Sequence, residues 1–341
     1  MFNKFIRGNF FEKKFFNLRK KSRFLEMRYR TVHGISKGFE EEEVNGNAKT
    51  SLRILKDACS SMHVGKCYDA NVIWIYWDSE LAVAPEVVRL SYASWKKLNP
   101  DYEVIYLNDK NIEGKLGFDF NAIFDMCNVR LTKANKADLL RVYLLTSFGG
   151  IWADATTFCL KSLSSWLPSI KRQTDFFMFR QEVVKSRPLE VWFIYAKKRS
   201  PVISEAFRLY LEHLIKNRKN TIYVSNSRKM MRKLGYEKTH PNRMYAKVVY
   251  DAERFGFMPY FTLSYLLNES MSMHLSSCEE KVFFKLPNFF CNNMDSMDVF
   301  LNSYVSKQTY KGEYQKSDLY LERKKYLTSV LIGKNLLHNF T

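Results

Sequence analysis

The sequence predicts an α/β protein with a mainly parallel central sheet. Strand-like apolar runs alternate with helical patterns from about residue 70 to residue 220, an alternation typical of parallel strands joined by helices. Residues 133–148 are apolar on almost every side, as expected of a buried helix. Gly149 and Gly150 follow, and they suit the left-handed turn that ends a helix. A short strand at 151–153 is then expected to enter the sheet.

The remaining elements follow from apolar periodicity and from turn residues. Strands are predicted at residues 71–77, 102–107 and 175–180, in addition to 151–153. Helices are predicted at residues 50–68, at 85–98 with Pro85 at an early position, weakly near 121–127, and at 133–148, 189–198 and 202–217. Residues 221–341 hold further helices and an aromatic-rich stretch, whose order in space the pattern does not give.

The chain divides into residues 1–48, a basic aromatic arm with an acidic linker, and a domain at 49–341. Within that domain we expect a core at 70–220 and a C-terminal region at 221–341. Residues 1–31 hold ten Lys or Arg against two Glu, a net charge of +8, interleaved with Phe side chains. Such a segment fits an anionic membrane surface, and equally a merely basic, partly ordered arm. Nucleic acid is a less favoured partner, because no recognised binding motif accompanies the charge.

Composition and the absence of common motifs exclude several classes of protein. The chain has 341 residues, a net charge of +19, 46% hydrophobic and 26% charged residues, which describes a globular protein with a core. Its six cysteines are scattered and favour a reducing compartment. Neither a signal peptide nor a transmembrane helix is visible, so we expect a cytoplasmic protein or one peripheral on the cytoplasmic face of the inner membrane. The dinucleotide, P-loop, zincin and hydrolase-elbow motifs are absent.

Three charged residues lie in or beside the apolar helix. Asp138 and Arg141 are three residues apart and share one face of it, and Asp154 follows the strand at 151–153. Burying such groups is costly unless each finds a partner. Taken separately, Asp138 and Arg141 could form a salt bridge within the helix, and Asp154 could be a turn residue that accepts from backbone amides. Their convergence at one strand end, where α/β folds place ligands, favours a binding site instead.

The same residues carry a resemblance to a known family. Residues 137–141 (Ala-Asp-Leu-Leu-Arg) and 148–154 (Phe-Gly-Gly-Ile-Trp-Ala-Asp) resemble glycosyltransferases of the sugar-binding DxD type. The match is closest to bacterial capsular polysaccharide synthesis proteins, relatives of the yeast Och1-like mannosyltransferases. Residues 72–77, 84–88, 94–100 and 192–196 are similar to further stretches of that family, and residues 306–311 weakly resemble a His-Lys-Leu-Thr-Tyr-Lys segment. The resemblance covers roughly residues 70–200 well.

The resemblance implies a GT-A fold, an α/β sheet that binds a nucleotide sugar, with a helical or irregular C-terminal acceptor region. It also implies transfer of a sugar from a nucleotide-sugar donor to a growing surface glycan of the capsular or lipopolysaccharide type, with retention of anomeric configuration. The acceptor would be a glycan or a lipid-linked glycan. Negative charge develops on the departing diphosphate, and a divalent cation or Lys and Arg side chains must stabilise it.

The resemblance also assigns roles to the charged residues. Asp154 matches the first acid of the family motif. Asp138 would orient sugar or ribose hydroxyls of the donor, and Arg141 would bind the donor or hold Asp138. Trp74 and Trp77 lie in the strand whose end should meet the nucleotide, although packing in the core explains them at least as well.

Two positions depart from the family pattern. Thr156 stands where the second acid commonly ligates the metal, so Mn²⁺ or Mg²⁺ on Asp154 and Thr156 would be held more weakly, or cationic side chains would do part of the work. Ser306 stands where the family segment has histidine, while Lys307 is a candidate phosphate partner or a solvated lysine. These departures leave a catalytically impaired sugar-nucleotide-binding protein as one alternative, and the +19 charge leaves a nucleic-acid-binding protein as another.

Overall fold

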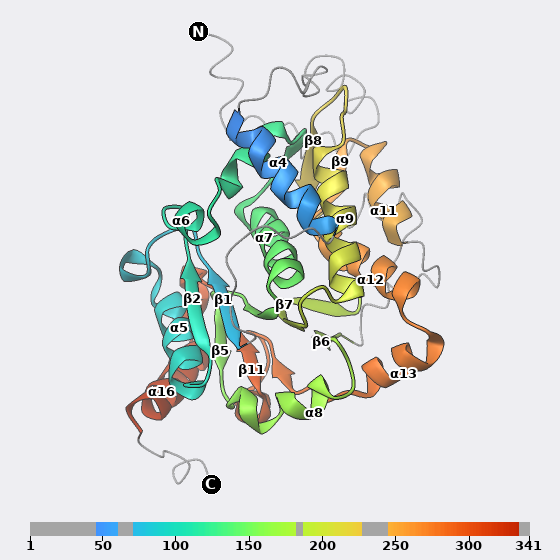
Figure 1. The fold of residues 1–341 in the computed structure, drawn as a ribbon. Helices are drawn as coiled ribbons and strands as arrows, with labels where there is room; N and C mark the ends of the chain where they lie inside the picture. Colours follow the sequence, from blue (N-terminus) through green and yellow to red (C-terminus); the bar gives the residue numbers. More distant parts are fainter. Residues whose placement is uncertain (1–45, 61–70, 182–186, 227–244, 334–341) are drawn as a thin grey trace.

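The computed structural model describes residues 46–60, 71–181, 187–226 and 245–333, which form a mixed α/β fold (Figure 1). A central five-stranded sheet has the order β2-β1-β4-β7-β6. Its strands are β1 (Val72–Tyr76), β2 (Glu103–Leu107), β4 (Gly150–Ala153), β6 (Phe176–Arg180) and β7 (Leu189–Ala196). The first three strands in that order are parallel, as predicted, whereas β7 runs antiparallel to both of its neighbours.

Two smaller sheets tie distant parts of the chain to this centre. One has the order β10-β11-β5 and the other the order β3-β8-β9. Their strands are β3 (Val129–Arg130), β5 (Thr157–Cys159), β8 (Ile222–Ser225), β9 (Phe257–Pro259), β10 (Phe290–Cys291) and β11 (Val305–Lys307). Strand β5 follows β4 closely in the chain and pairs antiparallel with β11, so the C-terminal region returns to the core.

Helices cover the central sheet from opposite sides (Figure 1). On one side, α7 contacts β1, β4 and β7 and packs against α4 and α9, and α12 packs against α9 and β7. On the other side, α5 packs on β2 and β5, with α16 outside it. The helices are α4 (Gly46–Cys59), α5 (Glu86–Leu98), α6 (Ile112–Leu116), α7 (Lys133–Ser147), α8 (Leu167–Lys171), α9 (Pro201–Ile215), α11 (Tyr245–Glu253), α12 (Thr262–His274), α13 (Ser277–Lys285), α14 (Met297–Asn302), α15 (Gly312–Gln315) and α16 (Asp318–Ile332), with 3₁₀ turns η1 (Leu81–Val83), η2 (Phe120–Met126) and η3 (Leu163–Ser165).

The turn between α7 and β4 requires both of its glycines. Gly149 and Gly150 have φ angles of +73° and +94°, in the left-handed region that other residues rarely adopt. A Cβ on Gly149 would lie 2.6 Å from the backbone nitrogen of Lys198, and one on Gly150 would lie 2.6 Å from Val72. The helix therefore ends and the strand begins where the sequence predicts, because only glycine fits this turn.

The segment predicted as a helix at residues 189–198 is instead strand β7. Its residues are almost all buried, and they pair with β4 on one edge and β6 on the other. A continuous apolar run cannot be assigned to helix or strand by periodicity alone, and here the β-branched and aromatic side chains of 191–195 decided for a strand. The short connection from β6, residues 181–188, makes the pair antiparallel. The central sheet is accordingly mixed rather than mainly parallel.

The structure describes only part of the N-terminal segment. Helix α4 begins at Gly46, inside the predicted linker, and covers the first part of the helix predicted at 50–68. The basic arm at residues 1–31 and the acidic run Glu40–Glu43 lie outside the described residues. In the part of the chain that is described, no helix is long and apolar enough to cross a membrane.

Candidate functional site

The site forms where β4 ends and the chain turns into β5. The backbone nitrogen of Asp154 donates to the carbonyl of Trp192 on β7, at 2.8 Å. The Asp154 carbonyl in turn accepts from the Thr157 backbone nitrogen at 3.0 Å and from the Thr157 hydroxyl at 2.7 Å. These bonds fix a tight turn at residues 154–156, so the Asp154 side chain has a defined position at the end of the strand, as predicted.

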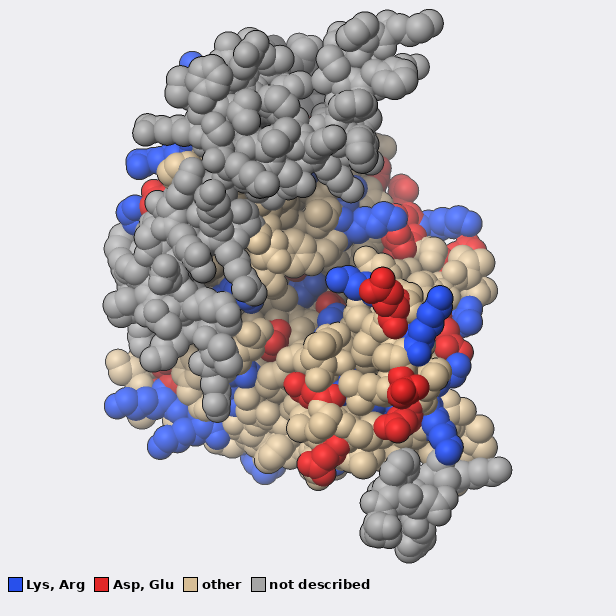
Figure 2. Space-filling view, turned by 180° about the vertical axis from the view of Figure 1, so that it is seen from behind, with Lys and Arg blue, Asp and Glu red and all other residues tan. Residues whose placement is uncertain are grey.

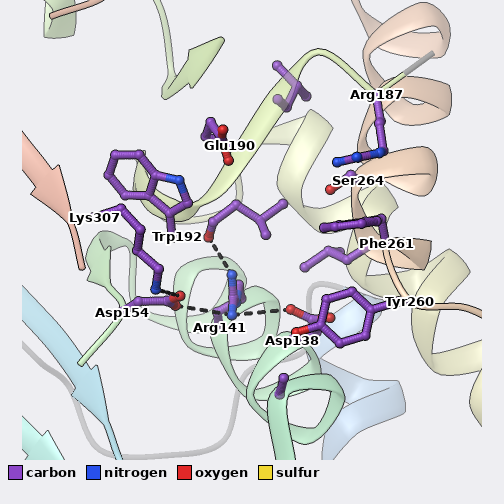
Figure 3. Close-up of a pocket in the computed structure, with 14 residues that line it drawn as sticks. Asp138, Arg141, Asp154, Arg187, Glu190, Trp192, Tyr260, Phe261, Ser264 and Lys307 are labelled. Carbon is purple, nitrogen blue, oxygen red and sulfur yellow. Dashed lines mark hydrogen bonds and ion pairs between the residues drawn. The ribbon is translucent and has the colours of Figure 1, made fainter. Parts of the chain in front are cut away.

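Helix α7 brings Asp138 and Arg141 to this turn (Figure 3). One guanidinium nitrogen of Arg141 lies 3.2 Å from Asp138 Oδ1 and also 3.2 Å from Asp154 Oδ1. The same guanidinium donates to the carbonyl of Val191 and lies over the Trp152 ring, 5.0 Å from its centroid. Arg141 is buried, with 5% of its side chain exposed. It is therefore held rigidly between two carboxylates.

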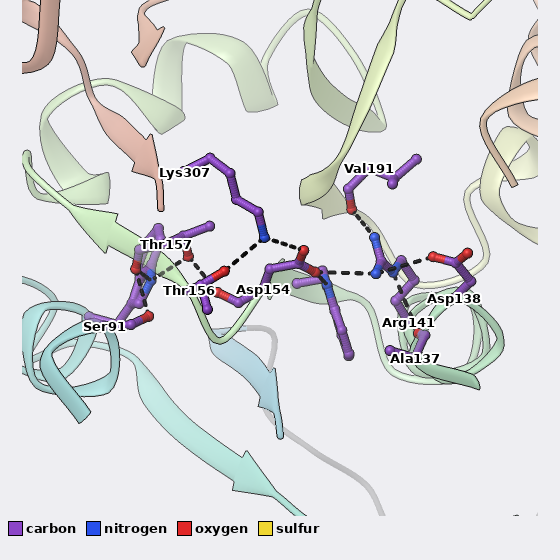
Figure 4. Close-up of polar contacts among 11 residues, drawn as sticks. Ser91, Ala137, Asp138, Arg141, Asp154, Thr156, Thr157, Val191 and Lys307 are labelled. Carbon is purple, nitrogen blue, oxygen red and sulfur yellow. Dashed lines mark hydrogen bonds and ion pairs between the residues drawn. The ribbon is translucent and has the colours of Figure 1, made fainter. Parts of the chain in front are cut away.

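A residue far away in the sequence completes the group (Figure 4). Strand β11 places Lys307 opposite Thr157 of β5. The Lys307 ammonium then lies 2.6 Å from Asp154 Oδ2 and donates to the Thr156 hydroxyl at 3.0 Å. Lys307, the candidate phosphate partner, therefore contacts both Asp154 and Thr156, although about 150 residues separate it from them in the chain.

The two acids of this cluster differ in their electrostatic environment. Burial raises the pKa of Asp138 from 3.8 to about 6, although Arg141 opposes the shift. Burial also disfavours the charged form of Asp154, but Lys307 and Arg141 outweigh it and hold the pKa of Asp154 below its usual value. At neutral pH Asp154 is firmly ionised, whereas Asp138 titrates close to the physiological range.

Asp138, Arg141 and Asp154 line one wall of a cavity with a volume of about 200 Å³. It is lined by Ala134, Asp138, Arg141, Asp154, Arg187, Leu189, Glu190, Val191, Trp192, Tyr260, Phe261, Leu263, Ser264 and Lys307. Three of these side chains are acidic and three are basic. Figure 2 shows a hollow on the face seen from behind, with charged side chains of both signs inside it.

Apart from Lys307, sequence reasoning missed the facing wall of the cavity. Glu190 was hidden by the wrong helix assignment at 189–198, and Tyr260 and Phe261 lie in the region whose order was not predicted. Arg187 lies over the Phe261 ring, 3.6 Å from its centroid. Burial raises the pKa of Glu190, and the amide of Gln181 and the charges of Arg187 and Lys307 oppose that shift. A polar residue inside an apolar strand was the signal that could have revealed Glu190.

Trp74 of β1 and Trp77, just after this strand, do not line the cavity. Trp74 is fully buried, and its indole N–H donates to the carbonyl of Gly149 at 3.0 Å. The prediction that Trp74 contacts the nucleotide sugar is therefore replaced by the packing alternative. Its ring is buried in the core, and its indole N–H is bonded to the backbone. Trp77 is partly exposed and packs edge-on against Tyr310, with ring centroids 5.2 Å apart. Its role in donor binding stays a prediction.

The arrangement of Asp154 and Thr156 is a poor fit for a divalent cation. Asp154 Oδ1 accepts from the Trp152 indole at 2.8 Å and faces Arg141, while Oδ2 faces Lys307. Across the described residues, no group of three or more His, Cys, Asp or Glu side chains is placed to hold a metal ion. Hard cations prefer several oxygen ligands, and here cationic side chains already occupy them. The Mn²⁺ or Mg²⁺ ion stays a prediction of the resemblance.

The chain is similar to a protein family, to a curated protein and to a solved structure. Residues 13–307 match the model of a family described as capsular polysaccharide synthesis protein. A curated yeast protein, "Putative glycosyltransferase HOC1" of Saccharomyces cerevisiae, is 22% identical in an alignment of 173 positions that covers 45% of this chain and 43% of that protein. This chain thus spans less than half the length of that relative. A solved structure, "PaToxG Glycosyltransferase", is 15% identical, covers 69% of this chain and 91% of its own, and has a TM-score of 0.30.

The family match covers most of the chain and includes every residue of the charged cluster, from Asp138 to Lys307. It confirms the family that residues 137–141 and 148–154 predict. The chain belongs to the capsular polysaccharide synthesis protein family.

Proposed function

We propose that this protein is a glycosyltransferase of the hexosyltransferase type, which moves a sugar from a nucleotide-sugar donor to a growing surface glycan. The observation that carries the proposal is the row Lys307–Asp154–Arg141–Asp138, which lines the cavity where β4 ends (Figure 3). Paired acids and cations at a strand end suit a ligand that carries both hydroxyls and phosphates. Family membership supports the same reaction class.

Each group of the row has a chemical task in this proposal. The cations of Arg141 and Lys307 would stabilise the charge that develops on the leaving diphosphate, and a site that is already arranged does so at little reorganisation cost. The carboxylate of Asp138 would accept hydrogen bonds from sugar or ribose hydroxyls. Asp154 would hold both cations in place and meet the sugar beside them. A GT-A type of donor domain and retention of anomeric configuration are further parts of the proposal, and they rest on the family resemblance.

The size of the cavity suits part of the donor. Pockets for whole cofactors commonly measure about 300–1,000 Å³. A cavity of about 200 Å³ fits the sugar and the adjoining phosphates rather than a whole nucleotide sugar. We expect the base to lie outside it.

Transfer or hydrolysis measured across a panel of nucleotide sugars tests the function. Release of the nucleoside diphosphate from one donor, with the sugar passed to a glycan or lipid-linked acceptor, is the expected result. Binding of a nucleotide sugar without transfer or hydrolysis would instead identify the alternative, a sugar-nucleotide-binding protein, for which Thr156 and Ser306 are the specific evidence. Binding of oligonucleotides alone would contradict both.

We also propose that residues 1–31 bring the protein to an anionic membrane surface, where a lipid-linked acceptor would be found. The support is the net charge of +8 and the interleaved Phe side chains. Deletion of residues 1–31 should weaken sedimentation with phosphatidylglycerol vesicles and leave the melting temperature of the remaining chain unchanged. Unchanged vesicle binding would contradict this part of the proposal.

A further inference from the structure

The Lys307 ammonium stands where a metal ion would be expected. Its nitrogen lies 2.6 Å from Asp154 Oδ2 and 3.0 Å from Thr156 Oγ1, the two positions of the acid motif (Figure 4). These are hydrogen-bond distances from one cation to two oxygen atoms. The side chain of Lys307 is 23% exposed, and it reaches this point from the cavity wall.

The backbone that carries Lys307 is anchored next to the site. Gln308 donates its backbone N–H to the carbonyl of Thr156 at 2.7 Å, and its amide side chain donates to the Ser306 hydroxyl at 2.6 Å. The Tyr314 hydroxyl donates to the side-chain oxygen of Gln308. The fully buried Arg323 in turn donates from its guanidinium to the Tyr314 hydroxyl at 3.2 Å. This buried network fixes the end of β11, so the ammonium is part of the fold and not a solvated lysine.

A divalent cation would have to displace this ammonium. Asp154 has one oxygen turned to Trp152 and Arg141 and the other turned to Lys307. A doubly charged ion at the Asp154–Thr156 pair would therefore lie against an ammonium and near a guanidinium in a partly buried site, where repulsion between cations is strong. Thr156 supplies a neutral hydroxyl in place of the second carboxylate that would offset this repulsion.

The ammonium still has capacity for a ligand. It carries three N–H donors, and its contacts with described residues use two of them. Lys307 also lines the cavity, so the third donor can meet a phosphate oxygen there. Arg141 offers a second, planar cation on the other side of Asp154.

We propose that Lys307 is the built-in cation of this site, and that it binds the donor diphosphate together with Arg141 without a divalent metal. This inference rests on the proposed glycosyltransferase function. In the transfer, the bond between the sugar C1 and the diphosphate oxygen breaks, and its electron pair stays on that oxygen beside Lys307. The acceptor hydroxyl oxygen bonds to C1, and its proton passes to the departing phosphate. Lys307 keeps its own protons throughout.

The test uses the full chain after EDTA treatment, with UDP and GDP as probes in titration calorimetry and the donor panel for activity. Wild type should bind one of the two probes in EDTA, and added Mn²⁺ or Mg²⁺ should change the affinity less than about twofold. Lys307→Met should weaken that binding about 10- to 100-fold, as expected for the loss of a charge-assisted hydrogen bond. Lys307→Arg should recover part of it.

Two controls separate a local effect from misfolding. Lys96→Met removes an exposed lysine on α5 and should leave probe affinity unchanged. Circular dichroism and melting of Lys307→Met report its fold, and Lys307→Arg keeps the charge if the Met variant is unstable. Binding or transfer that is lost in EDTA and restored by Mn²⁺ would overturn this inference while the proposed function stands. Failure to bind either probe and to use any donor, with and without metal, would overturn the proposed function as well.

Discussion

The two walls of the cavity are built in different ways. Asp138, Arg141 and Asp154 come from one short stretch, the middle of α7 and the residue after β4, joined by a glycine turn. The facing wall combines residues 187–192, residues 260–264 and Lys307, which come from three separate parts of the chain. The first wall is therefore fixed by local structure, whereas the second depends on long-range strand pairing. Substitutions in the first wall should change catalysis or stability directly. Substitutions behind the second wall should act indirectly, by shifting the position of Lys307.

The largest effect is expected at the residue that joins the two walls. Asp154→Asn should lower kcat/KM about 100-fold or more, a loss typical of a charged group at a reaction centre. The single amide oxygen can accept from only one of Trp152 and Lys307, so the melting temperature should fall, while circular dichroism should stay unchanged because the backbone of the turn is kept. Asp101→Asn, at an exposed carboxylate, is the matched control. A fully active Asp154→Asn variant would remove Asp154 from the site.

The glycine turn is the structural test of the first wall. Gly150→Ala should destabilise the protein by about 2–4 kcal/mol, because of the positive φ angle and a Cβ only 2.6 Å from Val72. Urea denaturation measures the loss. Gly312→Ala should be nearly neutral, because a Cβ there meets nothing within 4 Å. Equal stability of the two variants would show that the turn tolerates a side chain.

The buried Arg323 is the test of the second wall. Arg323→Met removes donors to the carbonyl of Asn292 and to Tyr314, which should cost about 1–3 kcal/mol of stability. Because Arg323 lies behind the segment that holds Lys307, the donor KM should rise more than kcat falls. Glu322→Met, exposed on the same helix α16, is the control. A loss of stability with an unchanged donor KM would show that Arg323 serves the fold alone.

The smallest effect is a pH dependence. With a pKa of about 6, Asp138 gains a proton as the pH falls through that value, so kcat/KM should decrease about tenfold per pH unit below it. Asp154 does not contribute, since its pKa is lowered. The pKa of Glu190 is also raised, and Asp138→Asn distinguishes the two: it should remove the acidic limb, whereas Asp101→Asn should keep it. An acidic limb that survives in Asp138→Asn would assign the titration to another group.

The same pKa of Asp138 has a consequence for stability. Between its ordinary pKa of 3.8 and about 6, the folded protein holds a proton at Asp138 that the unfolded chain releases. The contribution of this group to stability therefore falls as the pH rises through that window. Chemical denaturation at pH 4 and at pH 7, compared between wild type and Asp138→Asn, measures it.

Local patterns predicted most of the core correctly. The strand at 71–77, the helix after Pro85, the buried helix at 133–148 and the strand that leads to Asp154 all lie within a few residues of their predicted positions. Each has a strong local signal in apolar periodicity or in a glycine or proline boundary. The prediction was wrong at 189–198, where a run that is buried on both faces has no period to read.

The site shows the same division. Asp138, Arg141 and Asp154 were predicted to converge, because a helix, a two-glycine turn and a strand leave few alternative geometries. Lys307 was a candidate only by resemblance, and Trp74 was a candidate for donor binding with core packing as the alternative, which is where it lies. Glu190, Tyr260 and Phe261 were not predicted at all, since their segments reach the cavity through β7 and through the turn between β9 and α12.

By itself, the sequence determined the helix–turn–strand unit that carries the acids, because backbone conformation and burial there follow from residues close together in the chain. The tertiary structure alone decided what faces those acids. The pairing of β11 with β5 places the Lys307 ammonium between Asp154 and Thr156. That contact joins residues about 150 positions apart in the chain, and no local sequence pattern specifies such a pairing. The tertiary structure thereby brings a cation next to the acid motif.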